Sequence, residues 1–140
     1  MKMDPDVKYE DEEGKSSGEE NVKTAEAAPC PFCRIVRGEL PARLLYEDGE
    51  VLGFEDAHPQ APVHALIIPR RHIESLDHLT AADRGLAGHL ILVAVEVARR
   101  LGVAERGYRL VVNVRGEAGQ TVHHLHLHIL GGRALRWPPG

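Results

Sequence analysis

The segment HHLHLHIL, residues 123–130, alternates histidine with leucine or isoleucine along most of its length. Successive side chains of a β-strand point to opposite faces of the sheet. The pattern therefore predicts a strand with its histidines on one face and its apolar side chains in the core, with alternate residues about 7 Å apart. The aligned histidines are His124, His126 and His128. Their strict alternation favours a functional cluster over an ordinary solvent-exposed face.

The rest of the chain predicts four more strands around this segment. Asp48-Gly49 is a strong hairpin signal between two short strands, and residues 64–70 are nearly all apolar, as expected for a central strand. The five expected strands are residues 43–48, 51–56, 64–70, 108–114 and 123–130. Strands joined by tight turns point to an antiparallel sheet with helices on one face, which is an α+β fold.

Two helices complete the expected fold, one short and one long. Residues 30–39, CPFCRIVRGE, predict a short helix that is stopped by Gly38. Apolar residues recur at helical spacing over residues 86–101, which predicts the long helix. Thr80 and Asp83 have the spacing of a capping box just before it, with Asp in place of the usual Glu.

Composition separates an acidic tail from a nearly neutral body. Residues 1–28 hold nine acidic residues and four lysines, a net charge of −5, whereas residues 29–140 hold twelve acids and thirteen arginines, a net charge of +1. We expect the tail, either native or foreign to the domain, to be disordered, and residues 29–140 to form one domain. The neutral body gives no electrostatic case for nucleic-acid binding.

The sequence also gives no sign of a membrane protein. No apolar run approaches the ~20 residues needed to cross a bilayer, and the N-terminus does not resemble a signal peptide. Two cysteines three positions apart do not indicate an oxidising compartment. We therefore expect a cytoplasmic protein.

Residues just before the histidine segment offer neutral hydrogen-bonding groups. Gly116, Gly119 and Gln120 predict a flexible turn whose backbone N–H groups can face an anion, while Thr121 adds a hydroxyl and Asn113 an amide. With the imidazoles, these donors suit a phosphoryl group. Two interpretations remain, a histidine metal cluster or a nucleophilic histidine with assisting groups, and the neighbouring donors favour the second.

Three motifs resemble the histidine triad (HIT) superfamily, and in particular its histidine triad nucleotide-binding (HINT) branch. They are FEDAHPQAPVHALIIPRRH at residues 54–72, GEAGQTVHHLHLHILGGR at residues 116–133, and the ending WPPG. The resemblance runs from about Cys30 to Gly140. It implies a HIT-like fold in which two subunits form one continuous sheet.

The resemblance also implies roles for the histidines and for the hydroxyl beside them. His126 corresponds to the family's nucleophile, which attacks the α-phosphorus of a nucleotide and becomes transiently nucleotidylated. His128 would bond phosphate or leaving-group oxygens, and His64 matches a fourth histidine that supports the triad. Thr121 stands where the family usually has Ser. It keeps the hydroxyl that would donate to the leaving group, and its additional methyl would narrow the site.

A nucleotide-binding pocket follows from the same resemblance. Asp56 matches the acid that holds the ribose hydroxyls. Ala57 replaces the Ile or Leu common in relatives and would loosen the grip on the base. The segment ending in Trp137 would cross toward the active site of a partner subunit, although packing on its own domain is the alternative. The apolar wall of the purine site corresponds to Phe32, Ile35 and Phe54.

The cysteine pair admits a redox motif or a metal site. A redox motif should follow a buried strand within a βαβ unit, and here a polar tail precedes it, which favours metal. Bacterial relatives complete the set with two histidines, which correspond to His72 and His124. Cys30, Cys33, His72 and His124 would then hold a structural Zn²⁺ in a closed tetrahedral site.

The expected function is that of a dimeric hydrolase acting on P–N bonds, with purine nucleoside phosphoramidates and aminoacyl adenylates as substrates. A dinucleoside polyphosphate hydrolase is the alternative within enzymes, and the WPPG ending opposes it. A nucleotide-binding regulatory protein is the alternative of another class. A zinc hydrolase with the triad as ligands conflicts with a nucleophile that needs a free ring nitrogen.

Overall fold

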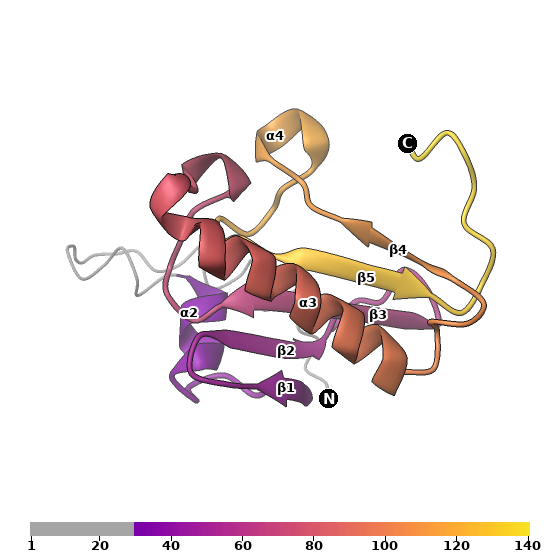
Figure 1. Cartoon of the computed structure of the whole chain (residues 1–140), viewed down its shortest axis with the longest axis horizontal. Helices are drawn as coiled ribbons and strands as arrows, with labels where there is room; N and C mark the ends of the chain where they lie inside the picture. The colour runs from indigo at the N-terminus through magenta and orange to yellow at the C-terminus, as the bar shows by residue number, and fades with distance from the viewer. Residues whose placement is uncertain (1–29) are drawn as a thin grey trace.

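The computed structural model describes residues 30–140, so the expected acidic tail lies outside the described residues (Figure 1). Five antiparallel strands form one sheet in the order β1-β2-β3-β5-β4. The strands are β1 (Leu44–Glu47), β2 (Val51–Glu55), β3 (Val63–Pro69), β4 (Tyr108–Val111) and β5 (Leu127–Gly131). The helices are α2 (Pro31–Val36), α3 (Arg84–Arg100) and α4 (Arg115–Ala118), with 3₁₀ turns η2 (Leu76–His78) and η3 (Ala81–Asp83). The predicted α+β class is confirmed.

The two main helices contribute to different cores on the two faces of the sheet, not to one face as the sequence predicts. Buried residues of α3 pack with Ala65, Ile67 and Ile129, and Figure 1 shows α3 lying across the sheet. Buried residues of α2 form a second core with neighbouring residues of the same strands, such as Leu66 and Ile68. β3 is apolar on both faces, so each face needs a cover, and each helix supplies one.

The predicted capping box forms at the start of the long helix. Thr80 Oγ1 accepts a hydrogen bond from the backbone N–H of Ala82, and an Asp83 carboxylate oxygen accepts one from the Thr80 N–H at 2.9 Å. These bonds cap η3, which leads directly into α3. Asp therefore performs the role of the usual Glu, since a 3₁₀ turn brings its shorter side chain close enough.

β5 begins at Leu127, so the predicted strand over residues 123–130 is too long at its start. The neighbouring strand β3 ends at Pro69, which has no N–H, and the carbonyl of Pro69 accepts a hydrogen bond from the ring of His124 instead. Leu125 donates its N–H to the carbonyl of Ile73, beyond β3. The alternation of faces nevertheless continues through this segment, because Leu125, like Leu127 and Ile129 in the strand, is buried in the core under α3.

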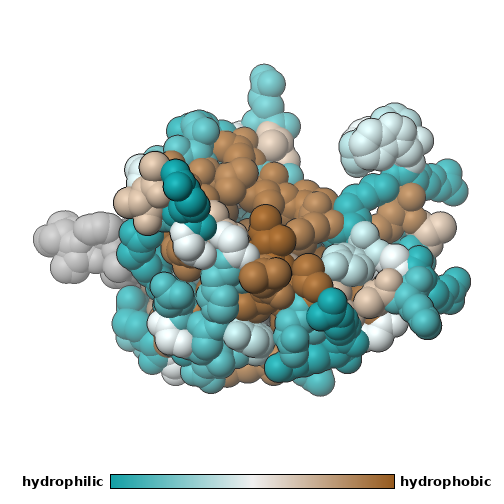
Figure 2. Space-filling view, in the orientation of Figure 1, coloured by the Kyte–Doolittle hydropathy of each residue, from teal (hydrophilic) through white to brown (hydrophobic). Residues whose placement is uncertain are grey.

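Apolar surface remains on the outer side of α3. Ile91 and Leu92 are 51% and 68% exposed, and Figure 2 shows hydrophobic surface gathered over this helix. Among residues 30–140, no helix combines the length and the apolar character needed to cross a membrane.

Candidate active site and metal centre

His126 is a buried imidazole whose protonation is set by a backbone carbonyl. Its Nδ1 lies 2.7 Å from the carbonyl oxygen of His124, and a carbonyl can only accept, so Nδ1 carries the ring proton. The Nε2 atom of the neutral ring then has a free lone pair. Burial lowers the pKa of His126, which keeps the ring neutral near pH 7. This is the state that a nucleophilic imidazole requires.

His64 and His128 form a hydrogen-bonded chain that begins at a backbone amide. The N–H of Gln60 donates to Nδ1 of His64 at 2.9 Å, so the proton of His64 lies on Nε2. That Nε2–H donates to Nδ1 of His128, also at 2.9 Å, which leaves the proton of His128 on its Nε2. His128 Nε2 is buried and has no hydrogen-bond partner among the described residues. The protein thus holds a free N–H donor beside His126, whose ring centroid is 4.9 Å away from that of His128.

Burial also keeps these two supporting rings neutral. Desolvation lowers the pKa of His64, partly opposed by the carboxylate of Asp56. Desolvation, with the neighbouring rings of His126 and His64, lowers the pKa of His128 to about 3. The chain of neutral donors and acceptors therefore persists through the physiological pH range.

Asp56 lies at the same end of the histidine group. One carboxylate oxygen is 3.3 Å from Nε2 of His64, and the other accepts the N–H of His58 at 2.8 Å. Asp56, His64 and His128, which we call the Asp56 cluster, have possible metal-ligating atoms within 4.8 Å of one another. His64 Nε2 carries a proton in this arrangement and has no lone pair for a metal.

The predicted apolar wall lies against the histidines. Phe32 of α2 packs edge-on against His126, with ring centroids 5.2 Å apart, and against Phe54 at 5.5 Å. Phe32, Ile35 and Phe54 are almost fully buried, and Ala57 packs against the same core. Phe32 is therefore the member of this group that touches the predicted nucleophile.

The loop before the histidines differs from its prediction. It contains the short helix α4, and the backbone N–H groups of Gly119 and Gln120 donate to the carbonyls of Gly116 and Arg115 at 3.0 and 3.1 Å. These amides close the C-terminus of α4, so the expected flexible turn with free N–H groups is wrong. Thr121 is exposed at the end of the loop, and Asn113 is half-buried before it.

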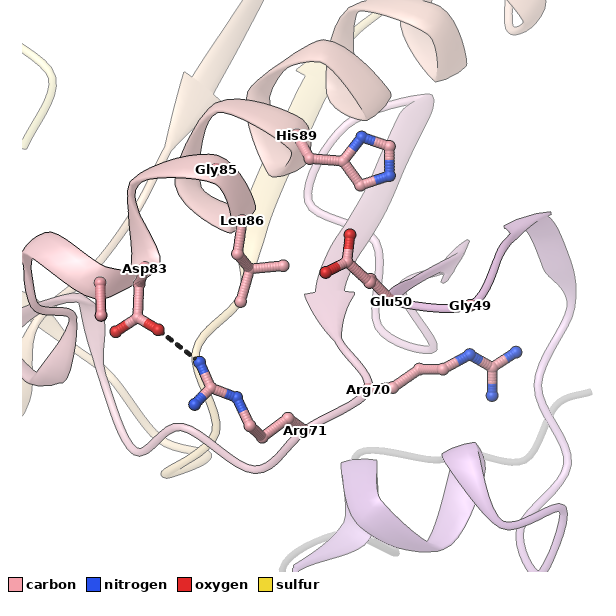
Figure 3. Close-up of a pocket in the computed structure, with 9 residues that line it drawn as sticks. Gly49, Glu50, Arg70, Arg71, Asp83, Gly85, Leu86 and His89 are labelled. Atoms are coloured by element: carbon pink, nitrogen blue, oxygen red, sulfur yellow. Dashed lines mark hydrogen bonds and ion pairs between the residues drawn. The ribbon is translucent and has the colours of Figure 1, made fainter.

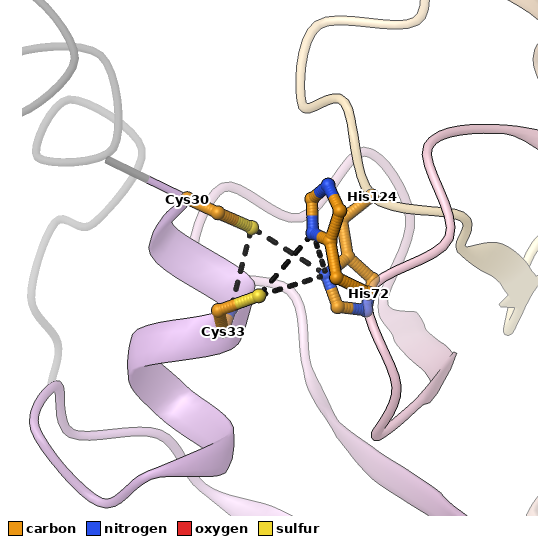
Figure 4. A group of neighbouring side chains, drawn as sticks. All are labelled: Cys30, Cys33, His72 and His124. Carbon is orange, nitrogen blue, oxygen red and sulfur yellow. Dashed lines mark hydrogen bonds between the residues drawn. The ribbon is translucent and has the colours of Figure 1, made fainter. Parts of the chain in front are cut away.

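Cys30, Cys33, His72 and His124, which we call the Cys₂His₂ cluster, meet from three separate parts of the chain (Figure 4). Their ligand atoms all lie within 4.8 Å of one another. Nδ1 of His124 is 3.4 Å from Cys30 Sγ and 3.2 Å from Nδ1 of His72, which lies 3.2 Å from Cys33 Sγ. The Pro69 carbonyl takes the Nε2–H of His124, so the lone pair on Nδ1 points into the cluster. The group can hold a metal ion.

The two thiols respond to their shared position in opposite ways. The Cys30 thiol donates to Cys33, which lowers the pKa of Cys33 and, with burial, raises that of Cys30. A soft divalent cation would bind both sulfurs as thiolates.

Within its own chain, Trp137 contacts Arg109 of the edge strand β4. It is 80% exposed, and the guanidinium of Arg109 on β4 lies 5.8 Å from the centroid of its ring system. Arg109 also donates to the carbonyl of Leu135 at 3.4 Å. The terminal segment, drawn in yellow in Figure 1, leaves the body beside β4, the edge strand.

A separate surface groove of about 730 Å³ lies between the β1–β2 turn, the end of β3 and the start of α3 (Figure 3). It contains none of the predicted nucleotide-binding residues. Its two guanidinium groups are paired within the protein: Arg71 with Asp83 at 2.6 Å, and Arg70 with Glu47 at 2.7 Å. Both arginines of the groove are therefore already engaged by carboxylates of the protein.

Sequence reasoning missed the backbone groups that set the tautomers of His64 and His124, which are the N–H of Gln60 and the carbonyl of Pro69. Both stand in the 54–72 motif, but every residue except proline has the same backbone donor and acceptor. No side-chain pattern could have indicated them.

Comparison with known proteins agrees with this geometry. Residues 37–135 match the family model described as HIT domain. An uncharacterized HIT-like protein of Synechocystis sp. is 53% identical over 109 residues, which cover 78% of this chain and 95% of the relative. The chain therefore belongs to the HIT family.

Solved structures of the family have the same fold. A HIT family hydrolase from Legionella pneumophila has a TM-score of 0.78 at 47% identity, covering 79% of this chain and 99% of that one. A histidine triad protein from Clostridium difficile has a TM-score of 0.75 at 36% identity, covering 82% of this chain and 97% of that one. The superfamily predicted from the histidine segment is thus confirmed.

Proposed function

We propose that this chain is a nucleotidyl hydrolase of the HINT branch, which cleaves purine nucleoside phosphoramidates such as adenosine 5′-monophosphoramidate and also aminoacyl adenylates. The observation that carries the proposal is the pair of ring nitrogens in the histidine site. His126 offers a lone pair on Nε2, and His128 offers an unpartnered N–H beside it. The Legionella relative described as a hydrolase supports the general reaction class.

The reaction proceeds in two steps. Nε2 of His126 attacks the α-phosphorus, the P–N bond to the amine breaks, and the amine leaves with a proton taken from solvent, while the Nε2–H of His128 donates a hydrogen bond beside it. In an aminoacyl adenylate, the bond that breaks is the P–O bond to the carboxylate, which leaves without a proton. The transient imidazolium at His126 keeps its Nδ1–H bond to the His124 carbonyl and stays in place. Water then attacks the same phosphorus, the bond to His126 breaks, one proton of the water passes to solvent, and the nucleoside monophosphate is released.

Nucleotide binding uses the groups around these rings. Asp56 accepts hydrogen bonds from the two ribose hydroxyls. Phe32, Ile35 and Phe54, with Ala57 at their edge, support the purine. Support for this assignment comes from the ring contact between Phe32 and His126, which joins the apolar wall to the nucleophile.

On the phosphate side, Asn113 and the Thr121 hydroxyl supply neutral donors that spread and hold the charge of the phosphoryl group. Gly119 and Gln120 shape the loop that carries Thr121.

Zinc is the proposed occupant of the Cys₂His₂ cluster. Two thiols and two imidazoles form the donor set that tetrahedral Zn²⁺ prefers, and the Nδ1 lone pair of His124 faces the other donors. A bound zinc would hold α2 and the loop after β3 against the segment that leads to His126. Because all four donors come from the protein, its role is structural. A cysteine pair that binds metal and forms no disulfide fits a reducing, cytoplasmic location.

We also propose a homodimer in which the two sheets are continuous. The exposed Ile91 and Leu92 of α3, together with the edge strand β4, support this arrangement because both would be covered by a partner. In the dimer the segment with Trp137 reaches the partner's active site. There the indole contacts the leaving group.

The deciding experiment is turnover of a fluorogenic adenosine phosphoramidate, measured beside a dinucleoside tetraphosphate. We expect a much higher kcat/KM for the phosphoramidate and protein-bound nucleotide in acid-quenched samples. Preference for the tetraphosphate would indicate the polyphosphate hydrolase. Tight binding of AMP without turnover of either compound would indicate a nucleotide-binding regulatory protein.

A further inference from the structure

The Gln120 side chain is 6% exposed, and its amide bonds to three backbone groups. Its carbonyl oxygen accepts the N–H of Arg115 at 2.8 Å. Its NH₂ group donates to the carbonyls of Glu74 and Val122 at 2.9 and 3.1 Å. Both hydrogens and the oxygen of the amide are thereby used inside the protein, so this side chain is not available to bind a ligand.

The bond from Gln120 to Val122 spans a single residue, Thr121. Because its two ends are the residues on either side of Thr121, it fixes the backbone that carries the Thr121 hydroxyl. Val122 is itself buried in the core under α2. Thr121 is exposed, but its position is tied to that core through the amide of Gln120.

The opposite end of the loop is held in an unfavourable conformation. Arg115 has φ +64°, in the left-handed region that is unfavourable for a residue with a side chain. Its N–H is the donor to Gln120, and its guanidinium pairs with Asp77 at 2.7 Å. Arg115 is thus held both by its backbone, through Gln120, and by its side chain, through Asp77.

The loop of residues 115–122 is held by two residues of one segment, residues 73–78. Glu74 accepts from Gln120, and Asp77 pairs with Arg115. In the same segment Ile73 accepts the N–H of Leu125 at 2.7 Å, next to His124 and His126. Residues 73–78 therefore support the loop and the start of the histidine segment together.

We infer that Gln120 is a positioning residue, which holds the Thr121 hydroxyl in a fixed place relative to His126. This inference rests on the proposed nucleotidyl transfer at His126. A hydroxyl that assists the transition state must be placed within a fraction of an ångström, and a misplacement of about 1 Å can cost about 100-fold in rate. Loss of the Gln120 bonds should therefore reduce kcat more than it weakens nucleotide binding.

The test is Gln120→Met, which keeps the size of the side chain and removes its three hydrogen bonds. We expect kcat for an adenosine phosphoramidate to fall about 10- to 100-fold, with the Kd for AMP changed less than about threefold. Glu117→Gln, at an exposed position of the same loop, is the matched control and should keep the kcat of the unmodified protein. A Gln120→Met kcat within threefold of the unmodified protein would overturn the inference. So would equal losses in kcat and in AMP affinity.

Amide hydrogen exchange provides a readout that does not depend on turnover. Gln120→Met should speed exchange over residues 115–122 and leave β2, β3 and α3 unchanged. If the unmodified protein hydrolyses no phosphoramidate, the proposed function fails, while faster loop exchange would still show that Gln120 holds the loop. Unchanged loop exchange would contradict the positioning role itself.

A second variant covers the case in which Gln120→Met does not fold. Gln120→Glu keeps the shape and the acceptor for Arg115, but places a carboxylate oxygen against the Glu74 and Val122 carbonyls. As with Gln120→Met, its kcat should fall by a larger factor than its affinity for AMP. Full kcat in a folded Gln120→Glu protein would overturn the inference as well.

Discussion

The Cys₂His₂ cluster and the Asp56 cluster are made of similar side chains and have similar dimensions, yet they are suited to different chemistry. In each, all possible ligand atoms lie within 4.8 Å of one another. The difference lies in where the ring protons are. At His124 the proton points outward to the Pro69 carbonyl, whereas at His64 the Gln60 N–H directs the proton inward toward His128. A lone pair facing inward suits a metal, and a proton facing inward suits a hydrogen-bonded chain.

This comparison shows that residue types and distances alone do not distinguish a metal site from a catalytic one. The single backbone group that binds the far side of each imidazole decides its tautomer, and the tautomer decides what the near side can do. His126 stands between the two clusters. Its ring is held by the carbonyl of the Cys₂His₂ residue His124, and it packs beside His128 of the Asp56 cluster.

The largest expected effect comes from removing the nucleophile that lies between the clusters. His126→Ala should lower kcat by at least about 10³-fold, because no other group supplies the attacking nitrogen. AMP should still bind, since its other contacts remain. Quenched samples of the unmodified protein should contain covalently bound nucleotide and those of the variant none. A variant with activity within a few-fold of the unmodified protein would rule out the proposed mechanism.

Removing a ligand of the Cys₂His₂ cluster should lower the melting temperature more than it changes the kcat of the protein that remains folded. The purified protein should contain about one zinc per chain, and Cys30→Ser should lose it. The melting temperature should fall by roughly 10 °C or more, since metal binding is coupled to folding.

The Asp56 cluster provides the matched control for this experiment. Asp56→Asn should retain the same zinc content, because the Asp56 cluster holds a proton where a metal would need a lone pair. The variant should bind nucleotide more weakly, because it loses the carboxylate proposed to accept the ribose hydroxyls. Metal analysis that finds no zinc in protein never exposed to chelator would contradict the zinc assignment. A chelator that stops turnover while the fold persists would indicate a catalytic metal.

The buried neutral rings of the Asp56 cluster predict acid sensitivity. Desolvation lowers the pKa of His128 to about 3, below the ordinary histidine value of about 6.5. Between these two pKa values, His128 binds a proton in the unfolded chain but not in the folded chain. Its contribution to the free energy of unfolding is therefore fully present above pH ~6.5 and is lost as the pH falls toward the folded pKa.

His128→Gln should consequently reduce the difference in melting temperature between pH 7 and pH 5 by a few degrees. His123→Gln changes an exposed histidine of the same segment and serves as the control. Thermal melts at matched zinc content would measure both. An unchanged pH dependence in the His128 variant would show that the ring is charged in the folded protein.

The smallest expected effect is on substrate choice. Deleting residues 135–140 should leave the dimer mostly assembled and change kcat/KM by different factors, each a few-fold, for phosphoramidates with different amine leaving groups. The reason is that, in the proposed dimer, Trp137 contacts the leaving group and not the nucleotide. Equal factors for all amines, or no change, would limit Trp137 to its contact with Arg109.

By itself, the sequence determined the class of fold, the faces of the histidine segment and the family. Alternation of His with Leu or Ile is a local property, and burial of Leu125, Leu127 and Ile129 follows from it directly. The capping box at Thr80 and the hairpin at Asp48-Gly49 are also local, since each depends on residues only a few positions apart. The Cys₂His₂ cluster followed from the family resemblance, because spacing alone supplied only the two cysteines.

Tertiary structure alone decided the tautomers of His64 and His124, the start of β5, the opposite placement of α2 and α3, and the use of Gln120. Each depends on a contact between residues distant in sequence: Pro69 with His124, Leu125 with Ile73, or Gln120 with Glu74. The groups involved are mostly backbone amides and carbonyls, which are the same in nearly every residue and leave no pattern in the sequence. Packing of the sheet selects which of them meet, and that selection determines that His124 presents a lone pair to its neighbours whereas His64 presents a ring proton.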